Sequence, residues 1–374
     1  MNRSAQLMAG FAAQNASLRR RLGLPLGDPS AWLRIGETTV GVVRDIEVDK
    51  VRKAGCVSEV TSPEAVLSNE TPPDRETAVA MAAASLLSSR EVTEVQVDRS
   101  LPFIFASALG NLNIIPRLDF ELGVVDRRAK SSDEIQYLAR AQAMTENLMR
   151  RVCERIARAD TDDEGYLVEN GSRLTSEELR RQVSIDAMSH GFSTSHGAII
   201  ASIPHVGDCH HVGEGFLQSG QTIIVDLFPR DDSTGYWGDC TRTVVHGDVP
   251  VHVKKMHQSV VRAKMAAIEK LACGVPASEV HDASTNCLLE DGYEQSRGVI
   301  TESASIQHGT GHGIGLDLHE PILLDSDPTP VLANEVFTVE PGLYGRADGG
   351  VRVEDMVVVD GDNLNKLHEG LDWS

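Results

Sequence analysis

The sequence has little that would cross-link it or hold it in a membrane. Its six cysteines are scattered, with no C-x-x-C pair, so we expect free thiols in a reducing compartment rather than a disulfide framework. No apolar run reaches the roughly 18 residues of a membrane span, and the first 30 residues hold no apolar core of a secretion signal. We therefore predict a cytoplasmic protein with no membrane partner.

Positive charge is also scarce. Lysine and arginine together number 35, against 55 aspartates and glutamates, which gives a formal net charge of −20. No dense basic block interrupts this acidity, and a surface of this sign repels a phosphate backbone. Nucleic acid is therefore not an expected partner.

The chain has 374 residues, which is long for one domain, and two domains are expected. Residues 1–125 are predicted to form an α/β domain. Four apolar runs there are interpreted as strand-like, AWLRIG, TTVGVVR, VTEVQVD and LPFIFA, and one alanine-rich stretch as a helix, RETAVAMAAASLLSSR.

Residues 126–374 are predicted to form an α+β domain with a curved, mainly antiparallel sheet. Ser131 and Glu134 are spaced as a helix-capping box, and Pro250 is placed to open a later helix. The strand-like runs are β-branched and bounded by Gly, Pro or Asp: HGAIIASIP, QTIIVDLFP, TRTVVHGDV, EVFTVEPGLY and GVRVEDMVVVD.

Four acids lie inside these apolar runs or directly before one, namely Asp226, Asp239, Glu340 and Glu354. A single acid in a strand is ordinarily paired or exposed at an edge, and Arg242, Arg346 and Arg352 are available as partners. Burying four isolated carboxylates costs several kcal/mol each, so together they require cations.

One histidine, His312 in HGTGHGIGLDLHEP, completes the set of candidate ligands. Carboxylate oxygens with one imidazole suit a pair of divalent ions such as Mn, Co, Fe or Zn. Two such ions, bridged by carboxylates, activate a shared hydroxide and polarise a carbonyl group, so hydrolysis is the expected chemistry.

The segments HGTGHGIGLDLHEP, FTVEPGLY and GGVRVEDMVVV, in that order after VDLF and GDCTRT, resemble the pita-bread metallopeptidases. This family contains Xaa-Pro dipeptidase (prolidase), aminopeptidase P and methionine aminopeptidase. The resemblance covers residues 126–374 through five ordered motifs. It implies a pita-bread catalytic domain, and residues 1–125 look like the creatinase-type N-terminal α/β domain of the prolidase branch.

The resemblance also implies a role for each metal ligand. Asp226 is expected to chelate one ion and His312 and Glu340 the other, whereas Asp239 and Glu354 bridge both. Manganese is the first expectation for the two divalent ions, with Co, Zn or Fe as alternatives. A homodimer is expected on the same ground.

Further site residues follow from the same motifs. Glu340 is expected to relay the proton of the bridging hydroxide, and His319 to stabilise the tetrahedral intermediate. Arg352 matches an arginine at the rim of the metal site, and His308 and Tyr344 match supporting residues near the substrate.

One histidine of the substrate cleft cannot be assigned from the register alone. Counting from the IIAS strand favours His210, whereas counting back from Asp226 leaves the register one residue short, so His211 remains the alternative. Neither His196 nor His205 matches a family role, and both are interpreted as structural.

The chain departs from the family in the connection between the first two aspartates. Asp226 and Asp239 lie 13 positions apart, two more than is usual in the family. An even insertion keeps the inward faces of both strands, so the ligands should still converge. Asp231, Asp232 and Tyr236 of the longer loop are expected near the mouth of the site.

The implied function is hydrolysis of the N-terminal Xaa-Pro bond of dipeptides or short peptides. Methionine aminopeptidase shares GHGIG…HE, but TRT, EPGLY, VRVED and the N-terminal domain favour the prolidase branch. The alternatives are methionine aminopeptidase-like or other amide specificity, a metal-independent creatinase-like hydrolase, and a non-catalytic binding protein. The last two predict missing acids, whereas all five ligand positions are filled.

Overall fold

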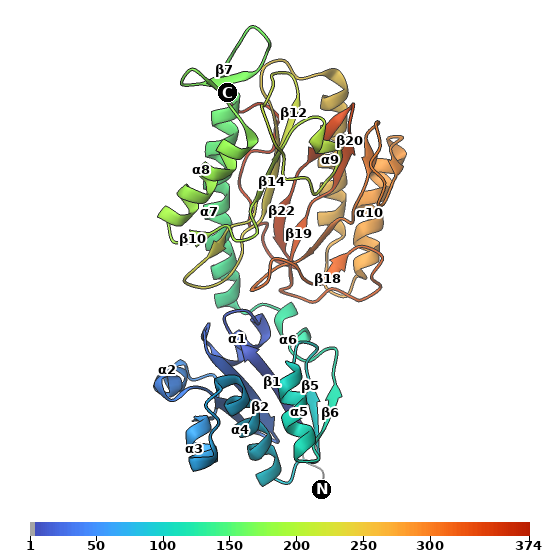
Figure 1. The fold of residues 1–374 in the computed structure, drawn as a ribbon. Coiled ribbons are helices and arrows are strands. Elements are labelled where there is room, and N and C mark those ends of the chain that lie inside the picture. The colour runs from blue at the N-terminus through green and yellow to red at the C-terminus, as the bar shows by residue number, and fades with distance from the viewer. Residues whose placement is uncertain (1–3) are drawn as a thin grey trace. The chain divides into compact units, whose positions relative to one another are not determined.

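The computed structural model describes residues 4–374, and the chain divides into two compact units, Met1–Arg127 and Arg128–Ser374 (Figure 1). Each unit has hydrophobic clusters of its own. Among the described helices, none combines the length and the apolar character needed to cross a lipid bilayer.

The first unit contains one mixed six-stranded sheet, in the order β4-β3-β2-β1-β5-β6. Its strands are β1 (Ala5–Phe11), β2 (Pro29–Ile35), β3 (Thr38–Val42), β4 (Glu59–Thr61), β5 (Glu94–Val97) and β6 (Ile115–Leu118). Its helices are α1 (Ala16–Leu22), α2 (Val48–Ala54), α3 (Pro63–Leu67), α4 (Arg75–Ser89) and α5 (Phe103–Asn111), and α6 (Val125–Arg128) spans the division. Strands β1, β2 and β3 pair antiparallel, and the outer pairs are parallel. The predicted α/β fold class is confirmed.

The prediction of a strand at LPFIFA was wrong, because this segment begins helix α5. The residue before the helix is Pro102, whose φ of −62° suits a helix start. Three side chains at helical spacing, Phe105, Ala108 and Leu109, are buried in the core of the unit. An unbroken run of six apolar residues has no period, and only the downstream spacing distinguishes helix from strand.

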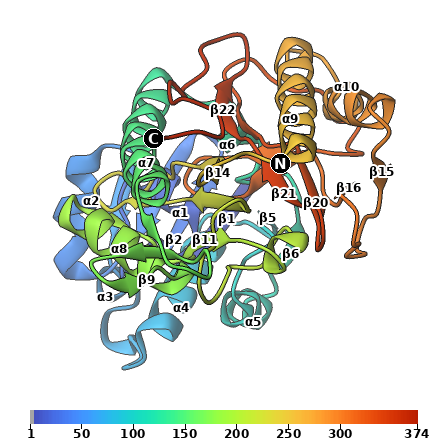
Figure 2. The same ribbon diagram turned by 90° about the horizontal axis from the view of Figure 1, so that it is seen from above.

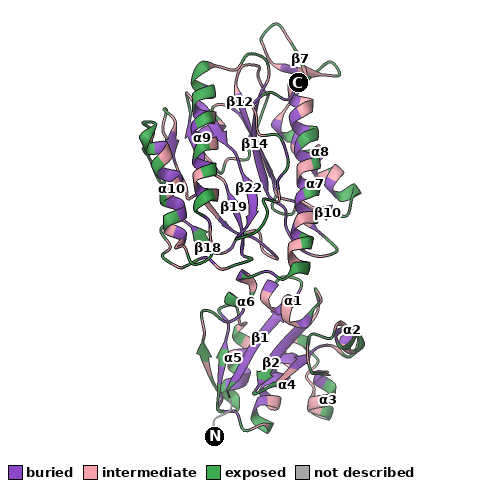
Figure 3. Ribbon diagram, turned by 180° about the vertical axis from the view of Figure 1, so that it is seen from behind, coloured by how far each residue is buried: buried purple, intermediate pink, exposed green. Residues whose placement is uncertain are grey.

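In the second unit, strands lie between two pairs of helices (Figures 1 and 2). Helices α7 (Ser132–Ala157) and α8 (Ser176–Ser189) cover one side, and α9 (Val251–Lys270) and α10 (Ala277–Glu290) the other. The predicted capping box is present, since Ser131 accepts from the N–H of Glu134 and the Glu134 carboxylate accepts from that of Ser131. Figure 3 shows buried inner faces and exposed outer faces on α7 and α9, as expected for amphipathic helices packed on a sheet.

The strands of this unit form three main sheets, and the predicted mainly antiparallel pairing is confirmed. The first sheet contains β11 (Ala198–Ala201), β12 (Thr222–Leu227) and β14 (Cys240–Val245). The second contains β15 (Glu294–Gln295), β16 (Ser305–Ile306), β20 (Gly342–Gly345) and β21 (Gly349–Arg352), and the third β18 (Glu320–Leu324), β17 (Gly311–Gly313), β19 (Val336–Val339) and β22 (Asp355–Val358). Short pairings involve β7 (Asp160–Thr161), β8 (Leu167–Glu169), β9 (Ser172–Arg173), β10 (Phe192–Ser193) and β13 (Arg230–Asp231).

Buried ion pairs join the start of this unit to its last strands. Arg128 donates to both carboxylate oxygens of Glu335, and Lys130 Nζ lies 3.0 Å from Glu320 Oε2. All four side chains are buried. Because an unpartnered charge in this environment is strongly penalised, each pair depends on both of its members.

The substitution Glu335→Ala should lower the free energy of unfolding of this unit by about 3–5 kcal/mol, because it leaves the Arg128 guanidinium buried without its carboxylate. Urea denaturation measures the change. The matched control is Glu154→Gln, which removes the partner of the exposed Arg158 at the end of helix α7 and should cost less than about 1 kcal/mol. Equal effects of the two substitutions would contradict the importance of the buried pair.

Candidate metal centre

A cavity of about 530 Å³ opens in the second unit. Its wall includes the five predicted metal ligands and four other predicted site residues: Asp226, Asp239, His312, Glu340, Glu354, His210, His308, His319 and Arg352. Tyr344 is fully buried beside this wall and bonds to His308 and Arg352. The structure therefore brings together all ten residues that were predicted as metal ligands, catalytic residues or supporting residues of the substrate.

Strand pairing and strand ends place the four carboxylates. Asp226 lies in β12, and Asp239 directly precedes β14, its antiparallel neighbour. Glu340 directly follows β19, and Glu354 lies in the two-residue gap between β21 and β22. The carboxylates therefore lie in or next to regular strands, whose backbone hydrogen bonds hold them in place.

The histidine ligand candidate presents a lone pair to two carboxylates. His312 Nδ1 lies 3.0 Å from the carbonyl oxygen of Gly313, so this nitrogen carries the proton and donates. Its Nε2 then faces Asp239 Oδ2 at 3.7 Å and Glu340 Oε1 at 3.5 Å. Burial lowers the pKa of His312 to about 3, so the ring is neutral and three electron-rich atoms face one another.

The carboxylates are buried close to one another without enough positive charge. Burial, then repulsion from Glu354, raises the pKa of Asp239 well above its usual value. Burial, then repulsion from Glu340, does the same for Glu354, and burial raises the pKa of Glu340 to about 7. Asp226 Oδ1 is buried with no hydrogen-bond partner. The donor set of hard oxygens and one imidazole therefore fits divalent cations.

Arg352 is the cation that contacts the cluster. It donates to Asp226 Oδ2 at 2.6 Å, to Thr241 Oγ1 at 3.1 Å and to the Tyr344 hydroxyl at 2.9 Å. Tyr344 is in turn 2.6 Å from His308 Nε2, whose other nitrogen donates to the Gly309 carbonyl. A directed chain of hydrogen bonds thus runs from Arg352 through Tyr344 to His308.

Arg242, considered as another partner of the acids, does not pair with any of the four. Its guanidinium donates to Asp355 Oδ1 at 3.0 Å, and Asp355 also accepts from Lys264 at 2.6 Å. This buried group lies next to Glu354 in the chain and orders the start of strand β22. Arg242 thus reaches the cluster only through the backbone carbonyl of Glu354, at 2.6 Å, whereas Arg352 pairs with a carboxylate.

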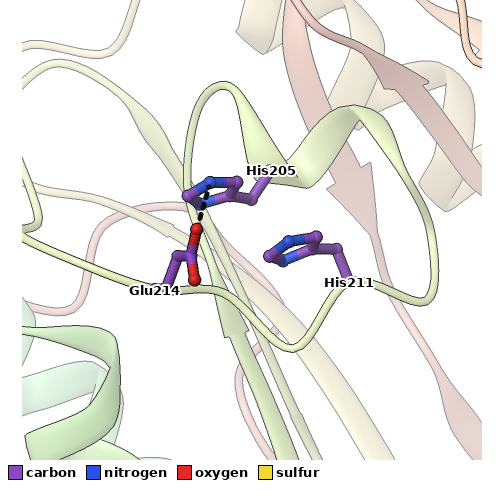
Figure 4. A group of neighbouring side chains, drawn as sticks. All are labelled: His205, His211 and Glu214. Carbon is purple, nitrogen blue, oxygen red and sulfur yellow. Dashed lines mark ion pairs between the residues drawn. The ribbon is translucent and has the colours of Figure 1, made fainter.

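The structure distinguishes the two adjacent histidines of the cleft. His210 is on the wall of the cavity, whereas His211 stacks on His205 with ring centroids 4.3 Å apart (Figure 4). His211 Nδ1 also accepts from the N–H of Gly213 at 3.0 Å. The ring of His319, also on the cavity wall, packs edge-on against His312, 4.2 Å between centroids. His210 and His319 are thus the two histidines, besides His308 and His312, that face the cavity.

The longer connection between the aspartates reaches the cavity wall through Phe228, and not through Asp231, Asp232 or Tyr236, which were expected near the mouth. The Asp231 side chain is fully buried and accepts from the N–H and hydroxyl of Ser233, closing a turn. Tyr236 donates to Glu134 on helix α7. Within the described chain, neither these two residues nor Asp232 contributes to the cavity wall.

Sequence reasoning missed three residues that hold the ligands. Thr241 donates to Glu354 Oε2 at 2.7 Å, and Thr338 donates to Glu340 Oε1 at 3.3 Å. The Gln142 side chain, on helix α7, pairs with both backbone groups of Asp239, at 2.8 and 2.9 Å. Thr241 is part of the TRT motif and could have been found, whereas no local pattern marks Gln142.

The substitution Thr241→Val should weaken binding of divalent metal by about 10- to 100-fold, because it removes the donor that orients Glu354 without changing side-chain size. Competition with a metal chelator measures the affinity. Thr243→Val is the control, since Thr243 bonds only to the backbone of Arg352. If both variants lose affinity equally, the hydroxyl of Thr241 has no specific role in orienting the ligand.

Similar proteins are known from several organisms. The chain is 29% identical over 266 residues to the "Probable dipeptidase PepE" of Mycobacterium tuberculosis, which covers 70% of this chain and 64%, slightly under two thirds, of that relative. It is 25% identical over 281 residues to the Xaa-Pro dipeptidase of Pyrococcus horikoshii, covering 74% and 73%.

Solved structures share the fold at low identity. A Bacillus anthracis Xaa-Pro dipeptidase superposes with a TM-score of 0.80 at 20% identity, covering 99% of this chain and 94% of that one. A Pyrococcus horikoshii prolidase gives 0.77 at 22%, covering 99% and 95%. The model of metallopeptidase family M24 matches residues 136–361, which contain every predicted site residue. This chain belongs to metallopeptidase family M24.

Proposed function

We propose that this protein is a dinuclear metal-dependent peptidase that hydrolyses the N-terminal Xaa-Pro bond of dipeptides or short peptides. The observation that carries the proposal is the convergence of four carboxylates and the neutral His312 on one cavity. Family membership supports a divalent metal and peptide chemistry. The names of the Mycobacterium and Pyrococcus relatives support the dipeptidase and Xaa-Pro assignments.

The two-ion assignment follows from charge. Asp226, Asp239, Glu340 and Glu354 present four negative charges, and Arg352 is the cation in direct contact with them. A single divalent ion would leave the cavity negative, whereas two ions match the four carboxylates. Asp239 and Glu354 are the bridging candidates because, with His312, they offer ligand atoms within 4.8 Å of one another. Manganese is the preferred metal in this proposal, with Co, Zn or Fe as alternatives.

Bound divalent ions would supply an activated water at neutral pH and a Lewis acid for the scissile carbonyl group. Glu340 takes the proton of the attacking water and passes it to the leaving amine, which is the general base and general acid role of a carboxylate at the reacting group. His319 and His210 both line the cavity and donate hydrogen bonds to the oxygen that gains charge at the reacting carbonyl.

Arg352 has two tasks in this proposal. It neutralises Asp226 through the 2.6 Å contact, and it fixes Tyr344 and, through it, the tautomer of His308. Because His308 Nδ1 is engaged by the Gly309 carbonyl, the ring is held in one orientation on the cavity wall. These residues therefore shape and order the substrate side of the cavity.

The substitution Glu340→Gln should lower kcat by about 10²- to 10⁴-fold, because the amide cannot accept and return the proton. Metal content, measured on the same samples, separates loss of a ligand from loss of the proton relay. A variant that retains both metals and near-full turnover would remove the proton role from Glu340.

The decisive test is turnover by metal-stripped protein reloaded with Mn²⁺ or Co²⁺. Three substrates are compared: an Xaa-Pro dipeptide, an Xaa-Pro-Xaa tripeptide and a Met-Ala peptide. Metal-dependent cleavage of the dipeptide alone would establish a prolidase, and cleavage of the tripeptide an aminopeptidase P. Cleavage of the Met-Ala peptide alone would favour methionine aminopeptidase-like specificity, and two bound metals without any turnover would disprove the peptidase proposal.

A further inference from the structure

The segment between strands β11 and β12 is unusually rich in metal-binding side chains. Residues 205–214 have the sequence HVGDCHHVGE, in which six of ten residues are His, Cys, Asp or Glu. The structure separates them into two groups whose potential ligand atoms lie within 4.8 Å of one another, Asp208–Cys209–His210 and His205–His211–Glu214. None of these six residues belongs to the carboxylate cluster of the metal centre.

The second group does not have the geometry of a metal site. The rings of His205 and His211 are parallel, 6° between planes and 4.3 Å between centroids (Figure 4). A nitrogen lone pair lies in the plane of its ring, so two stacked rings cannot direct theirs at one ion. His211 Nδ1 is also occupied by the Gly213 N–H, and His205 Nε2 faces Glu214 at 3.4 Å. This group is a stacked pair with one carboxylate.

The first group has the spacing that a tetrahedral ion imposes. Cys209 Sγ and His210 Nδ1 are 3.6 Å apart. Bonds of about 2.3 Å to sulfur and about 2.1 Å to nitrogen, at the tetrahedral angle, place those two atoms about 3.6 Å apart. The Asp208 carboxylate provides a third ligand atom within reach, and its Oδ1 already accepts from the N–H of His210 at 3.0 Å.

The backbone of this group is fixed at both sides. The N–H of Cys209 donates to Gln307 Oε1 at 3.2 Å, and Gln307 in turn donates to the Gly207 carbonyl at 2.7 Å. The Cys209 carbonyl accepts from Arg352 at 3.3 Å. Binding would therefore require only side-chain adjustment. Both Cys209 and His210 line the cavity, so an ion in the cavity can reach their side chains.

We propose that Asp208, Cys209 and His210 form a separate site for a thiophilic divalent cation, Zn²⁺ or Cd²⁺, on the wall of the catalytic cavity. The thiol S–H bond is replaced by a sulfur–metal bond, and the proton goes to water. Thiolate selects soft ions, whereas the carboxylate cluster has no sulfur and suits Mn²⁺. One cavity thus presents two sites of different metal preference.

Occupancy of this site inhibits peptide hydrolysis, because it fixes the ring of His210 and places an ion in the substrate space. This regulatory part rests on the proposed peptidase function. The metal-binding part does not, since it depends only on the three side chains.

The binding test is titration of the full-length, Mn²⁺-loaded protein with Cd²⁺, followed through the ultraviolet absorption of cadmium–thiolate bonds. Because the carboxylate cluster contains no thiol, the band reports cysteine ligation alone. We expect a component that saturates at one ion per chain and is lost in Cys209→Ser and in His210→Ala. The matched control His205→Ala removes a histidine of the stacked pair and should keep the band. Persistence of the full band in Cys209→Ser, or its loss in His205→Ala, would overturn the site.

The inhibition test uses the peptide that the Mn²⁺-loaded protein cleaves. The Cd²⁺ concentration that halves wild-type turnover should leave Cys209→Ser at its own uninhibited rate. Equal inhibition of both proteins would overturn the regulatory role. The two proposals can fail independently. A Cys209-dependent band without peptide cleavage would support the metal site and contradict the peptidase function. Peptide cleavage without the band would support the peptidase function and contradict the metal site.

Discussion

Repulsion among buried carboxylates is the constraint on which the second unit depends. Four acids lie on one cavity with a single arginine, Arg352, in contact with them, and three of them have pKa values raised by burial and mutual repulsion. Such a group is stable only where the surrounding structure resists its separation. The antiparallel pairing of β12 with β14, and of β19 with β22, supplies that resistance. The fold therefore holds these carboxylates together at an electrostatic cost that bound divalent cations would relieve.

Neutral side chains orient the candidate ligands on this scaffold through hydrogen bonds. Thr241 and Thr338 each orient one carboxylate, and Gln142 holds the backbone of Asp239 from helix α7. Loss of a side chain that orients a metal ligand typically costs about 10- to 100-fold in metal affinity, so these three side chains are part of the candidate centre. Gln142 also connects the centre to helix α7, which packs on β12 and β14.

The convergence of the candidate ligands was predictable from sequence because most of its signal is local: an acid in or next to an apolar strand is conspicuous wherever it occurs. The side chains that support them were not predictable, because their contacts join distant parts of the sequence. Gln142 and Asp239 are 97 positions apart, and Lys130 and Glu320 are 190 positions apart. Two errors have physical causes. LPFIFA has no internal period, so helix α5 could not be distinguished from a strand, and the direction of the Asp231 side chain was decided by its own turn rather than by loop length.

The buried pairs of Arg128 and Lys130 bear on where the metal-binding unit begins. The family match starts at residue 136, downstream of both cations, although Glu320 caps the N–H groups of Leu316 and Asp317 in the loop that presents His319. At the other end, Leu371 and Trp373 are core residues beyond the matched range. A fragment cut to the boundaries of sequence similarity would therefore carry every candidate ligand and yet leave Glu335 and Glu320 buried without their cations. It would also lack the core side chains at the C-terminal end.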